Sequence, residues 1–470
     1  MEQEKIELAW LPDLIYTGGR FESGLAIVCD GAGRISRVAA ASEVEGSAVR
    51  LKGRAALPGL VNAHSHAFQR VIRGRTEYRT GNGSDDFWTW REMMYSAATR
   101  LSPGDLYDAS RMTFLEMALG GITSVGEFHY IHHAPEGKPY DDPNLLSKTV
   151  IRAARDVGLK ICLLRVAYAR SGFNAEPNPK QARFMERDSE SFLKHAELLK
   201  AWAEKEEAGR AWVGLAPHSV RAVPLDYLRD CFLYAQQGEL PLHMHIAEQP
   251  AELEACVKEH GLTPVALLER EGFLTERFTG VHGIHITGEE ARMLSRSRSI
   301  ICACPTTERN LGDGAIPAGL LFKEGVRVSL GTDSHTQIEM MEDARELEYN
   351  MRLARLERVV LDRTNDAPSA LASSLFDCAT RHGAESIRVP ASDGTLATGQ
   401  AADFFTIDLH HPSIAGASTE DLLAHIVFSL QTAAVREVVV GGRMIVSDGR
   451  HHSQQEITGR FVALQKRLWS

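Results

Sequence analysis

The sequence predicts an α/β fold: a parallel (β/α)8 barrel of the TIM type, with a small β-sandwich domain made from the N- and C-terminal segments. Three observations support this prediction. Apolar, strand-like runs alternate with helical patterns through the middle of the chain, both ends carry short strands separated by turns, and reactive side chains follow several of the runs. A chain of 470 residues has room for a barrel of ~250 residues or more and a smaller domain.

The predicted barrel spans residues 57–390. Eight apolar runs of strand length recur in it, and helical patterns lie between them, as a parallel barrel requires. The runs are Leu57–Ala63, Ile122–Phe128, Leu159–Ala167, Trp212–Ala216, Leu240–Ile246, Thr279–Ile284, Ser299–Ala303 and Val326–Leu330, and the clearest helical patterns are Asp105–Leu119, Ser189–Glu206, Pro250–His260 and Gly288–Ser295.

Residues 1–56 and 391–470 together predict the second domain. Runs such as Gly24–Val28 and Glu437–Val446 have the composition of strands that flank turns. Because the two ends of a chain commonly lie close together at a domain surface, we expect one composite β-sandwich. Its surface is expected to carry two histidine pairs, His410-His411 and His451-His452.

The composition is typical of a globular protein and excludes several classes. Hydrophobic residues make up 44% and charged residues 24%, and the sequence has no run of about 18 apolar residues. The net charge of −10 disfavours nucleic acid and anionic membranes as partners. Seven scattered cysteines do not form a disulfide framework, and the first residues lack the pattern of a signal peptide, so we expect a cytoplasmic protein in a reducing compartment.

Histidines and acidic residues gather at the carboxyl ends of the first, fifth, sixth and eighth predicted strands. In such a barrel these ends meet at one rim, where active sites lie. His64 and His66 are two positions apart on a strand, so both side chains point to the same side, about 7 Å apart. Each motif by itself is weak, but their coincidence at one rim predicts a metal site. The four strand ends are Asn62–His66, His243–Glu248, Val281–His285 and Gly331–His335.

These motifs resemble the amidohydrolase superfamily, and within it the branch of mononuclear deaminases. The resemblance rests on Pro58–His66, on His245 followed three residues later by Glu248, on His282 and on Gly331-Thr332-Asp333, and it covers the whole chain. Further segments are similar to the formimidoylglutamate deiminases of histidine degradation. The arginines in these segments distinguish that group from the other deaminases of the branch. They are His66–Arg70, Phe87–Glu92, Glu127–Tyr130, Ala216–Arg221 and Cys304–Gly314.

The resemblance implies one divalent metal per subunit, expected to be zinc, held by His64, His66, His245 and Asp333. Three neutral imidazoles and one carboxylate suit Zn²⁺ and leave a position for water, and Fe²⁺ is compatible with the same ligands. Binuclear relatives bridge two metals through a carboxylated lysine on the fourth strand. That strand ends here in Ala216-Pro217-His218, without a lysine, so we expect a single ion.

The resemblance also implies a hydrolase that acts on a C–N bond, other than a peptide bond, in a linear amidine. The expected reaction converts N-formimino-L-glutamate and water to N-formyl-L-glutamate and ammonia. Asp333 would accept a proton from the attacking water, Glu248 would protonate the departing nitrogen, and His282 would hydrogen-bond the attacking oxygen. These three residues are the expected catalytic groups.

The expected substrate carries two carboxylates, so its site should offer arginines, which bind a carboxylate through two hydrogen bonds. The resemblance implies that Arg91 and Arg221 make these contacts and that Gln69, Tyr130 and His218 add polar ones. Three of these residues have a plainer interpretation: Arg91 as a surface residue of a loop helix, Arg221 as half of a strand-end salt bridge, and Gln69 as a helix cap.

Two other functions stay open at this stage. A purine or adenosine-derivative deaminase of the same branch would need groups that stack on a planar ring rather than two arginines, and a non-catalytic scaffold would have a broken ligand set. The resemblance further implies a homodimer. Several remaining motifs are interpreted as packing, loop or supporting groups: His129, His132, His133, His243, His285, His335 and Cys302-Ala303-Cys304.

Overall fold

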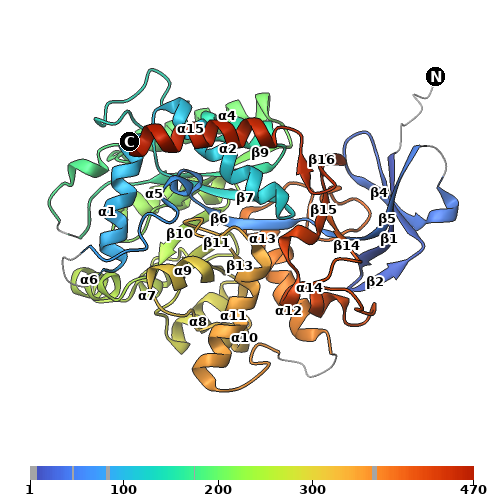
Figure 1. Ribbon diagram of the computed structural model, residues 1–470. Coiled ribbons are helices and arrows are strands. Elements are labelled where there is room, and N and C mark those ends of the chain that lie inside the picture. Colours follow the sequence, from blue (N-terminus) through green and yellow to red (C-terminus); the bar gives the residue numbers. More distant parts are fainter. Residues whose placement is uncertain (1–7, 45–46, 81–84, 174, 363–367) are drawn as a thin grey trace.

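The computed structural model describes residues 8–44, 47–80, 85–173, 175–362 and 368–470. Its larger part is a barrel built from the middle of the chain, and its smaller part is a sheet built from both ends (Figure 1). The first seven residues, which the sequence analysis assigns to the β domain, lie outside the described residues. A search of the described helices finds none with the length and apolar composition of a membrane span.

Within the described residues, eight parallel strands form the barrel in chain order, which confirms the predicted fold class. The last strand returns to the first: the backbone N–H of Asp333 donates to the His64 carbonyl (3.0 Å), and the N–H of His66 donates to the Asp333 carbonyl (3.1 Å). The strands are β6 (Leu60–Ser65), β7 (Ile122–His129), β8 (Lys160–Ala167), β9 (Ala211–Pro217), β10 (Leu242–Ile246), β11 (Phe278–His282), β12 (Ile300–Ala303) and β13 (Arg327–Leu330).

Helices cover the outside of the barrel (Figure 1). Several begin where the sequence supplies a cap; Ser102 and Thr287, for example, each form a capping box with the acidic residue three positions later. The helices are α1 (Phe87–Ala98), α2 (Pro103–Leu119), α3 (Leu145–Val157), α4 (Ser189–Glu206), α5 (Leu225–Gln237), α6 (Pro250–His260), α7 (Pro264–Arg270), α8 (Gly288–Arg296), α9 (Pro305–Leu311), α10 (Ala318–Glu324), α11 (Met340–Arg355), α12 (Ala370–Ala379) and α13 (Arg381–Ile387), with the short 3-10 helices η2 (Ala67–Ile72) and η3 (Pro179–Gln181).

The barrel strands read as continuous apolar runs because both of their faces are covered. Every residue of β7 and β8 is buried, between the helices outside and the side chains that fill the barrel inside. The two cations of β8 are paired: the Lys160 ammonium lies 2.6 Å from Asp403 of the β domain, and Arg165 pairs with Glu186. Burial of these charges is tolerable because each has a partner.

The terminal segments together form a separate β-rich part of the molecule. Within the described residues its nine strands belong to one mixed sheet in the order β17-β16-β15-β14-β5-β1-β3-β4, with β2 beside β1. Trp10 and Phe404, from opposite ends of the chain, meet in its core with ring centroids 5.6 Å apart. The elements are β1 (Leu8–Thr17), β2 (Arg20–Ser23), β3 (Leu25–Cys29), β4 (Ile35–Ala40), η1 (Ala41–Glu43), β5 (Ser47–Pro58), β14 (Phe404–Asp408), α14 (Leu422–Ser429), η4 (Thr432–Ala434), β15 (Val435–Val440), β16 (Arg443–Ser447) and β17 (Arg450–His451).

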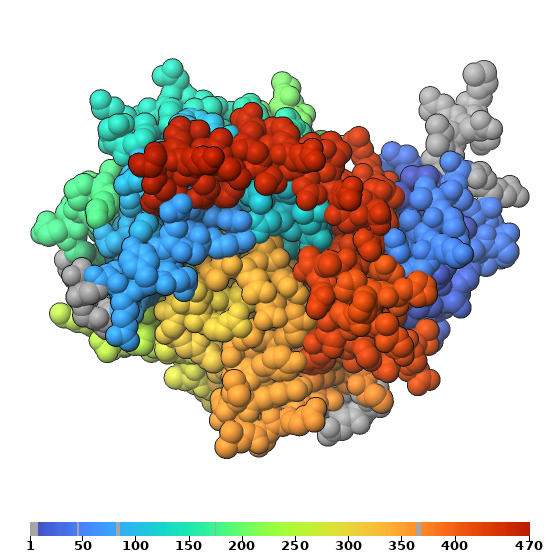
Figure 2. Space-filling model, in the orientation of Figure 1, coloured from blue at the N-terminus to red at the C-terminus, as the bar shows by residue number. Residues whose placement is uncertain are grey.

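The last helix, α15 (Gln454–Trp469), lies on the barrel rather than in the β domain, although it belongs to the segment 391–470 (Figure 1). In the space-filling view it crosses the blue and cyan N-terminal part of the barrel (Figure 2). Arg460 pairs with Asp108 of α2 at 2.7 Å, which helps to hold the helix there. The C-terminal segment therefore spans both parts of the molecule.

One of the histidines expected on the surface of the β domain is buried. His410 and His452 are exposed, but His451 is almost completely covered, with its Nε2 3.0 Å from the Val157 carbonyl at the end of α3. The expectation fails for His451 because β17 packs against the barrel, so its side chain fills the junction between the two domains.

Candidate metal centre and active site

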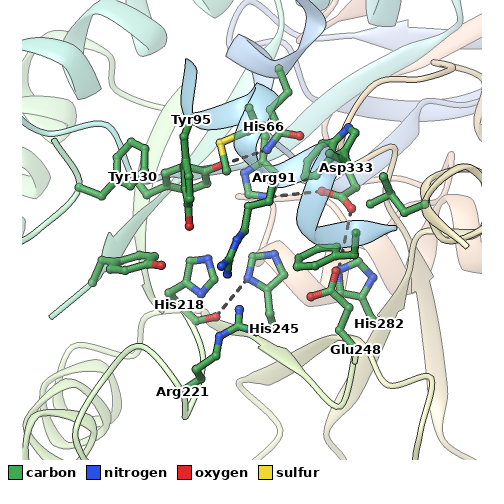
Figure 3. Close-up of a pocket in the computed structure, with 17 residues that line it drawn as sticks. His66, Arg91, Tyr95, Tyr130, His218, Arg221, His245, Glu248, His282 and Asp333 are labelled. Atoms are coloured by element: carbon green, nitrogen blue, oxygen red, sulfur yellow. Dashed lines mark hydrogen bonds and ion pairs between the residues drawn. The ribbon is translucent and has the colours of Figure 1, made fainter. Parts of the chain in front are cut away.

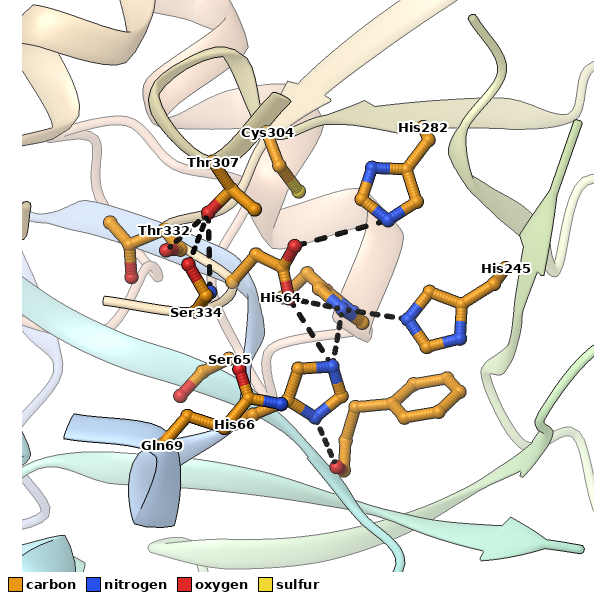
Figure 4. A network of polar contacts seen from close by, with 12 residues as sticks. His64, Ser65, His66, Gln69, His245, His282, Cys304, Thr307, Thr332 and Ser334 are labelled. Atoms are coloured by element: carbon orange, nitrogen blue, oxygen red, sulfur yellow. Dashed lines mark hydrogen bonds and ion pairs between the residues drawn. The ribbon is translucent and has the colours of Figure 1, made fainter. Parts of the chain in front are cut away.

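Three imidazoles and one carboxylate converge at the carboxyl-terminal rim of the barrel (Figure 4). The Nε2 atom of His64 lies 3.1 Å from that of His66 and 3.3 Å from that of His245. The Oδ1 atom of Asp333 lies 3.5 Å from His64 Nε2 and 3.3 Å from His66 Nε2. The four residues that the sequence analysis names as ligands therefore point at one another.

The spacing of these atoms fits a single bound ion. Four ligands about 2.0–2.1 Å from a tetrahedral Zn²⁺ lie roughly 3.3–3.4 Å from one another. The two N···N and two N···O separations, between 3.1 and 3.5 Å, match this edge length. Imidazole nitrogen and carboxylate oxygen are also donors that divalent transition metals accept. The cluster can hold a divalent metal without rearrangement.

Backbone carbonyls fix the orientation of two of the rings. His66 Nδ1 lies 2.9 Å from the Phe128 carbonyl, and His245 Nδ1 lies 3.1 Å from the His218 carbonyl. A carbonyl can only accept, so each Nδ1 carries the hydrogen and each Nε2 presents its lone pair to the centre. Burial also lowers the pKa of both imidazoles, which keeps them neutral and able to bind a cation.

Asp333 is held in an unusual backbone conformation. Its φ of 44° lies in the left-handed region, where a non-glycine residue is strained. Burial raises the pKa of its carboxyl, but the hydrogen bond from His64 and the neighbouring imidazoles outweigh burial and hold the pKa well below its ordinary value. The carboxylate therefore stays ionised across the physiological range of pH.

A buried polar network lies behind the candidate ligands, where β6 and β13 meet. The Ser65 hydroxyl donates to Glu127 (2.5 Å) and lies 3.1 Å from His335 Nε2. The other ring nitrogen of His335 is 3.0 Å from the Thr332 hydroxyl, which accepts a hydrogen bond from Asn62 (2.7 Å). Ser65 lies between the candidate ligands His64 and His66, and Thr332 precedes the candidate ligand Asp333. The network therefore ties the two segments that carry these candidates together.

Glu248 and His282 lie beside this cluster, as the sequence predicts. His282 Nε2 is 3.6 Å from Glu248 Oε1 and 3.9 Å from Asp333 Oδ2, so the imidazole stands between two carboxylates. Burial lowers the pKa of His282, but Glu248 and its other acidic neighbours outweigh burial and raise it well above the ordinary value. Burial raises the pKa of Glu248. This pair can hold and pass a proton.

A cavity opens in front of the cluster (Figure 3). It contains all five expected substrate contacts, together with several apolar and aromatic side chains. Its lining residues are His66, Gln69, Phe87, Trp90, Arg91, Met94, Tyr95, Tyr130, Tyr168, Phe184, His218, Arg221, His245, Glu248, His282, Leu311 and Asp333.

Arg91 on α1 and Arg221 after β9 point into this cavity from opposite sides (Figure 3). Both guanidinium groups stack near the Trp88 ring, at 4.4 and 5.8 Å from its centroid respectively. Arg91 Nε and Arg221 Nη1 are buried and have no hydrogen-bond partner in the described part of the chain. A buried cationic donor without a partner is costly, so these atoms are suited to an anionic ligand.

The other three expected contacts line the same cavity. Gln69 Nε2 donates to the Tyr130 hydroxyl (2.9 Å), so Gln69 does not act as a helix cap. Its Oε1 is buried without a partner among the described residues. His218 packs its ring 4.8 Å from that of His245, and its carbonyl orients His245. His218 therefore lines the cavity and also helps to orient His245.

Several groups of this site were not predicted from the sequence. Tyr95 and Tyr168 line the cavity, and Glu252, Glu308 and Asp313 are buried around Glu248 and His282. Two signals were present: Glu252 follows Glu248 by one helical turn, and Glu308 and Asp313 lie inside the segment that resembles the deiminases. Tyr168 had no signal, because it only follows the end of β8.

The remaining histidines and cysteines lie in structural positions. His243 Nε2 contacts the Ser386 carbonyl at 2.9 Å, and His132 and His133 contact the Val166 and Met185 carbonyls at 2.8 and 2.9 Å. Cys302 and Cys304 are free and buried, as are the other five cysteines of the described residues. His335 belongs to the network behind the candidate ligands. His285 Nε2 is buried and has no hydrogen-bond partner among the described residues.

The fold and the site define a barrel hydrolase with a histidine-rich centre for a divalent metal. Comparison with known families gives a match to the Amidohydrolase family over residues 55–445, and the chain belongs to this family. Members of the family bind a divalent metal and act on C–N bonds, and the chain is an enzyme of this kind.

Individual relatives agree with this assignment. The chain is 38% identical over 410 residues to formimidoylglutamate deiminase of Pseudomonas aeruginosa, covering 87% of this chain and 88% of the relative. It is 26% identical over 400 residues to 5-methylthioadenosine/S-adenosylhomocysteine deaminase of Natronomonas pharaonis, covering 84% and 82%. Among solved structures, an amidohydrolase from Brucella melitensis matches with a TM-score of 0.89 and 30% identity over the full length of both chains.

Proposed function

We propose that this enzyme hydrolyses N-formimino-L-glutamate to N-formyl-L-glutamate and ammonia, as a step of histidine degradation. The observation that carries the proposal is the pair Arg91 and Arg221, whose buried N–H groups lack a partner among the described residues. A substrate with two carboxylates at one end and an amidine at the other fits a cavity with two arginines facing a metal centre. The deiminase from Pseudomonas aeruginosa supports the same substrate.

One divalent metal belongs to this proposal, held by His64, His66, His245 and Asp333, and we propose Zn²⁺ because the ligand atoms have its tetrahedral spacing. When bound, the ion supplies a Lewis acid that makes water nucleophilic near neutral pH. Fe²⁺ accepts the same donors. Elemental analysis of protein purified without added metal tests the assignment; iron in place of zinc would overturn it.

The protein's own groups then move the protons. As the water oxygen adds to the amidine carbon, Asp333 Oδ2 accepts a proton and His282 Nε2–H donates to the oxygen of the tetrahedral adduct. Glu248 delivers a proton to the terminal nitrogen, so that the C–N bond breaks and ammonia leaves. A C=O double bond forms, which gives the N-formyl product. Burial raises the pKa of Glu248, which favours the protonated form that can donate.

The carboxylates of the substrate occupy the other end of the cavity. Arg91 and Arg221 each offer two N–H groups in a plane, which matches the geometry of a carboxylate. Gln69, Tyr130 and His218 line the same cavity and add polar contacts to the substrate.

Ammonia release tests the substrate assignment. Purified enzyme should release ammonia from N-formimino-L-glutamate, more slowly from N-formiminoglycine, which lacks one carboxylate, and not measurably from adenosine or 5-methylthioadenosine. A preference for the nucleosides would replace the proposal with the purine-type deaminase, the alternative that the relative from Natronomonas pharaonis represents. No bound metal and no gain of activity on adding zinc would instead indicate a non-catalytic scaffold.

We also propose a cytoplasmic homodimer, which the family resemblance implies. Light scattering coupled to gel filtration tests this: a dimer has twice the chain mass of 51.8 kDa.

A further inference from the structure

Glu308 is a buried carboxylate that the mechanism above does not use. It lies in the first turn of α9, the helix that follows β12 in the chain, and is only 2% exposed. Its Oε1 accepts a hydrogen bond from the Cys304 backbone N–H (2.8 Å) and lies 3.3 Å from His282 Nδ1. Glu308 does not line the substrate cavity; among the described residues, His282 is the cavity-lining side chain that its carboxylate contacts directly.

The chemistry of the two side chains fixes the direction of this hydrogen bond. An ionised carboxylate can only accept, so His282 Nδ1 carries the hydrogen and donates it to Glu308. The opposite ring nitrogen, Nε2, then faces Glu248 and Asp333, the two carboxylates of the reaction. Rotation of the ring by half a turn would turn a carbon atom toward Glu308 and lose the contact.

The surroundings of Glu308 support a specific role. Within the described residues, the one basic side chain within 4 Å of its carboxylate is His282. A buried carboxylate whose partners are one backbone N–H and one imidazole is expensive unless that imidazole contact is kept. The Cys304 thiol is close enough to suggest a second metal site with His282 and Glu308, but Oε1 is already engaged by two N–H groups.

The backbone of His282 provides a further reason for such a support. Its φ of 73° is in the left-handed region, where a non-glycine residue is held by its surroundings. His282 is the last residue of β11, where it pairs with Ile246, and this backbone pairing does not set the rotation of its ring. A fixed acceptor on the neighbouring element supplies that orientation.

We propose that Glu308 is the positioning residue of His282: its carboxylate accepts the Nδ1–H hydrogen bond and so aims Nε2–H at the oxygen that adds to the amidine carbon. This inference rests on the proposed function, because it takes His282 as a group of that reaction. It differs from a structural role, because Glu308 acts on one ring and not on the metal ligands or the substrate cavity.

The test compares Glu308→Ala with Glu308→Gln, in which the amide oxygen can still accept from both N–H groups. Turnover of N-formimino-L-glutamate by Glu308→Ala should fall about 10–100-fold in kcat, with KM and metal content close to those of the wild type. Glu308→Gln should recover most of the lost activity. A crystal structure of Glu308→Ala should show the His282 ring rotated or displaced, with its Nε2 no longer near Asp333.

Asp343 provides a matched control. It is another fully buried carboxylate that anchors the same helix, through Thr306 N and Oγ1 at 3.0 and 2.9 Å, but it does not touch His282. Asp343→Asn should therefore keep the wild-type kcat. The inference is wrong if Glu308→Ala keeps full activity, if its ring geometry is unchanged, if Glu308→Gln is as slow as Glu308→Ala, or if Glu308→Ala loses metal or raises KM in step with kcat.

The outcomes also separate this inference from the proposed function. A wild-type enzyme that does not turn over N-formimino-L-glutamate overturns the proposed function. The ring orientation seen in the variant structures still decides whether Glu308 positions His282. If Glu308→Ala does not fold, the Gln variant and its structure carry the comparison, and a displaced ring or a large loss of kcat in that variant overturns the inference.

Discussion

The metal end of the cavity and its arginine end differ in how their polar groups are satisfied. At the metal end, His66 and His245 each give Nδ1–H to a backbone carbonyl, and their Nε2 atoms already have the spacing of ligands. At the arginine end, Arg91 and Arg221 rest against aromatic rings and keep buried N–H groups without partners among the described residues.

This difference indicates that the two ends have different roles, one in the reaction and the other in substrate recognition. Groups that must act on the reacting atoms are fixed in advance, because misplacement by about 1 Å can cost two orders of magnitude in rate. Groups that recognise the substrate are left incomplete, so that the ligand itself supplies the missing hydrogen bonds. Changes at the metal end should therefore act on kcat, and changes at the arginine end should act mainly on KM.

The largest effect is expected from Glu248→Gln. The amide keeps the shape of the side chain but cannot deliver a proton, so kcat should fall by about 10²–10⁴ while KM and metal content stay near wild type. Steady-state ammonia release and elemental analysis measure these quantities. Near-normal kcat would show that Glu248 does not donate the proton. Changes at the metal end would then not act on kcat as the comparison predicts.

Arg221→Ala should have the next largest effect. Loss of hydrogen bonds between charged partners costs about 1.5–3 kcal/mol, which corresponds to roughly a 10–100-fold decrease in kcat/KM, mostly through KM. The same measurement with a formimino compound that has no carboxylate provides the control. An equal loss with that compound would show that Arg221 does not recognise the carboxylates.

Ser65→Ala tests the network behind the ligands. Without the hydroxyl, Glu127 and His335 each lose a buried partner, so the free energy of unfolding should fall by about 1–3 kcal/mol. Denaturant unfolding measures this change. Ser147→Ala is the control, because the Ser147 hydroxyl is buried without a partner among the described residues and its removal should cost little. Equal losses would show that the network adds no stability.

Asp343→Asn should affect catalysis least of these variants. Its expected effect is on the free energy of unfolding and on how that free energy varies with pH. Burial raises the pKa of Asp343 from 3.8 to about 8 in the folded protein. Because the unfolded chain releases this proton at the lower pH, the folded state is favoured at low pH and loses that advantage as the pH rises from about 4 to 8. Asp343→Asn should remove this loss, so its unfolding midpoint should exceed that of the wild type more at pH 8 than at pH 5. A constant difference across that range would contradict the prediction.

Much of the barrel could be predicted because its signals are local. Apolar runs of strand length and capped helices are visible in short windows of sequence, and β7, β8 and α4 lie within a few residues of their predicted bounds. The placement of α15 and the burial of His451 could not be predicted in this way. Both depend on which surface of the barrel the C-terminal segment meets, and that contact leaves no pattern in the segment itself.

The sequence by itself determined the inventory of this site: His64, His66, His245 and Asp333 at strand ends, with Glu248 and His282 beside them, because a barrel brings the carboxyl ends of its strands to one rim. Only the tertiary structure decided how each group is held. The carbonyls that orient His66 and His245 and the carboxylate of Glu308 behind His282 come from elements far apart in the chain. The same packing leaves N–H groups of Arg91 and Arg221 without a partner among the described residues. Such contacts depend on distances of a few ångströms, which residue order alone does not specify.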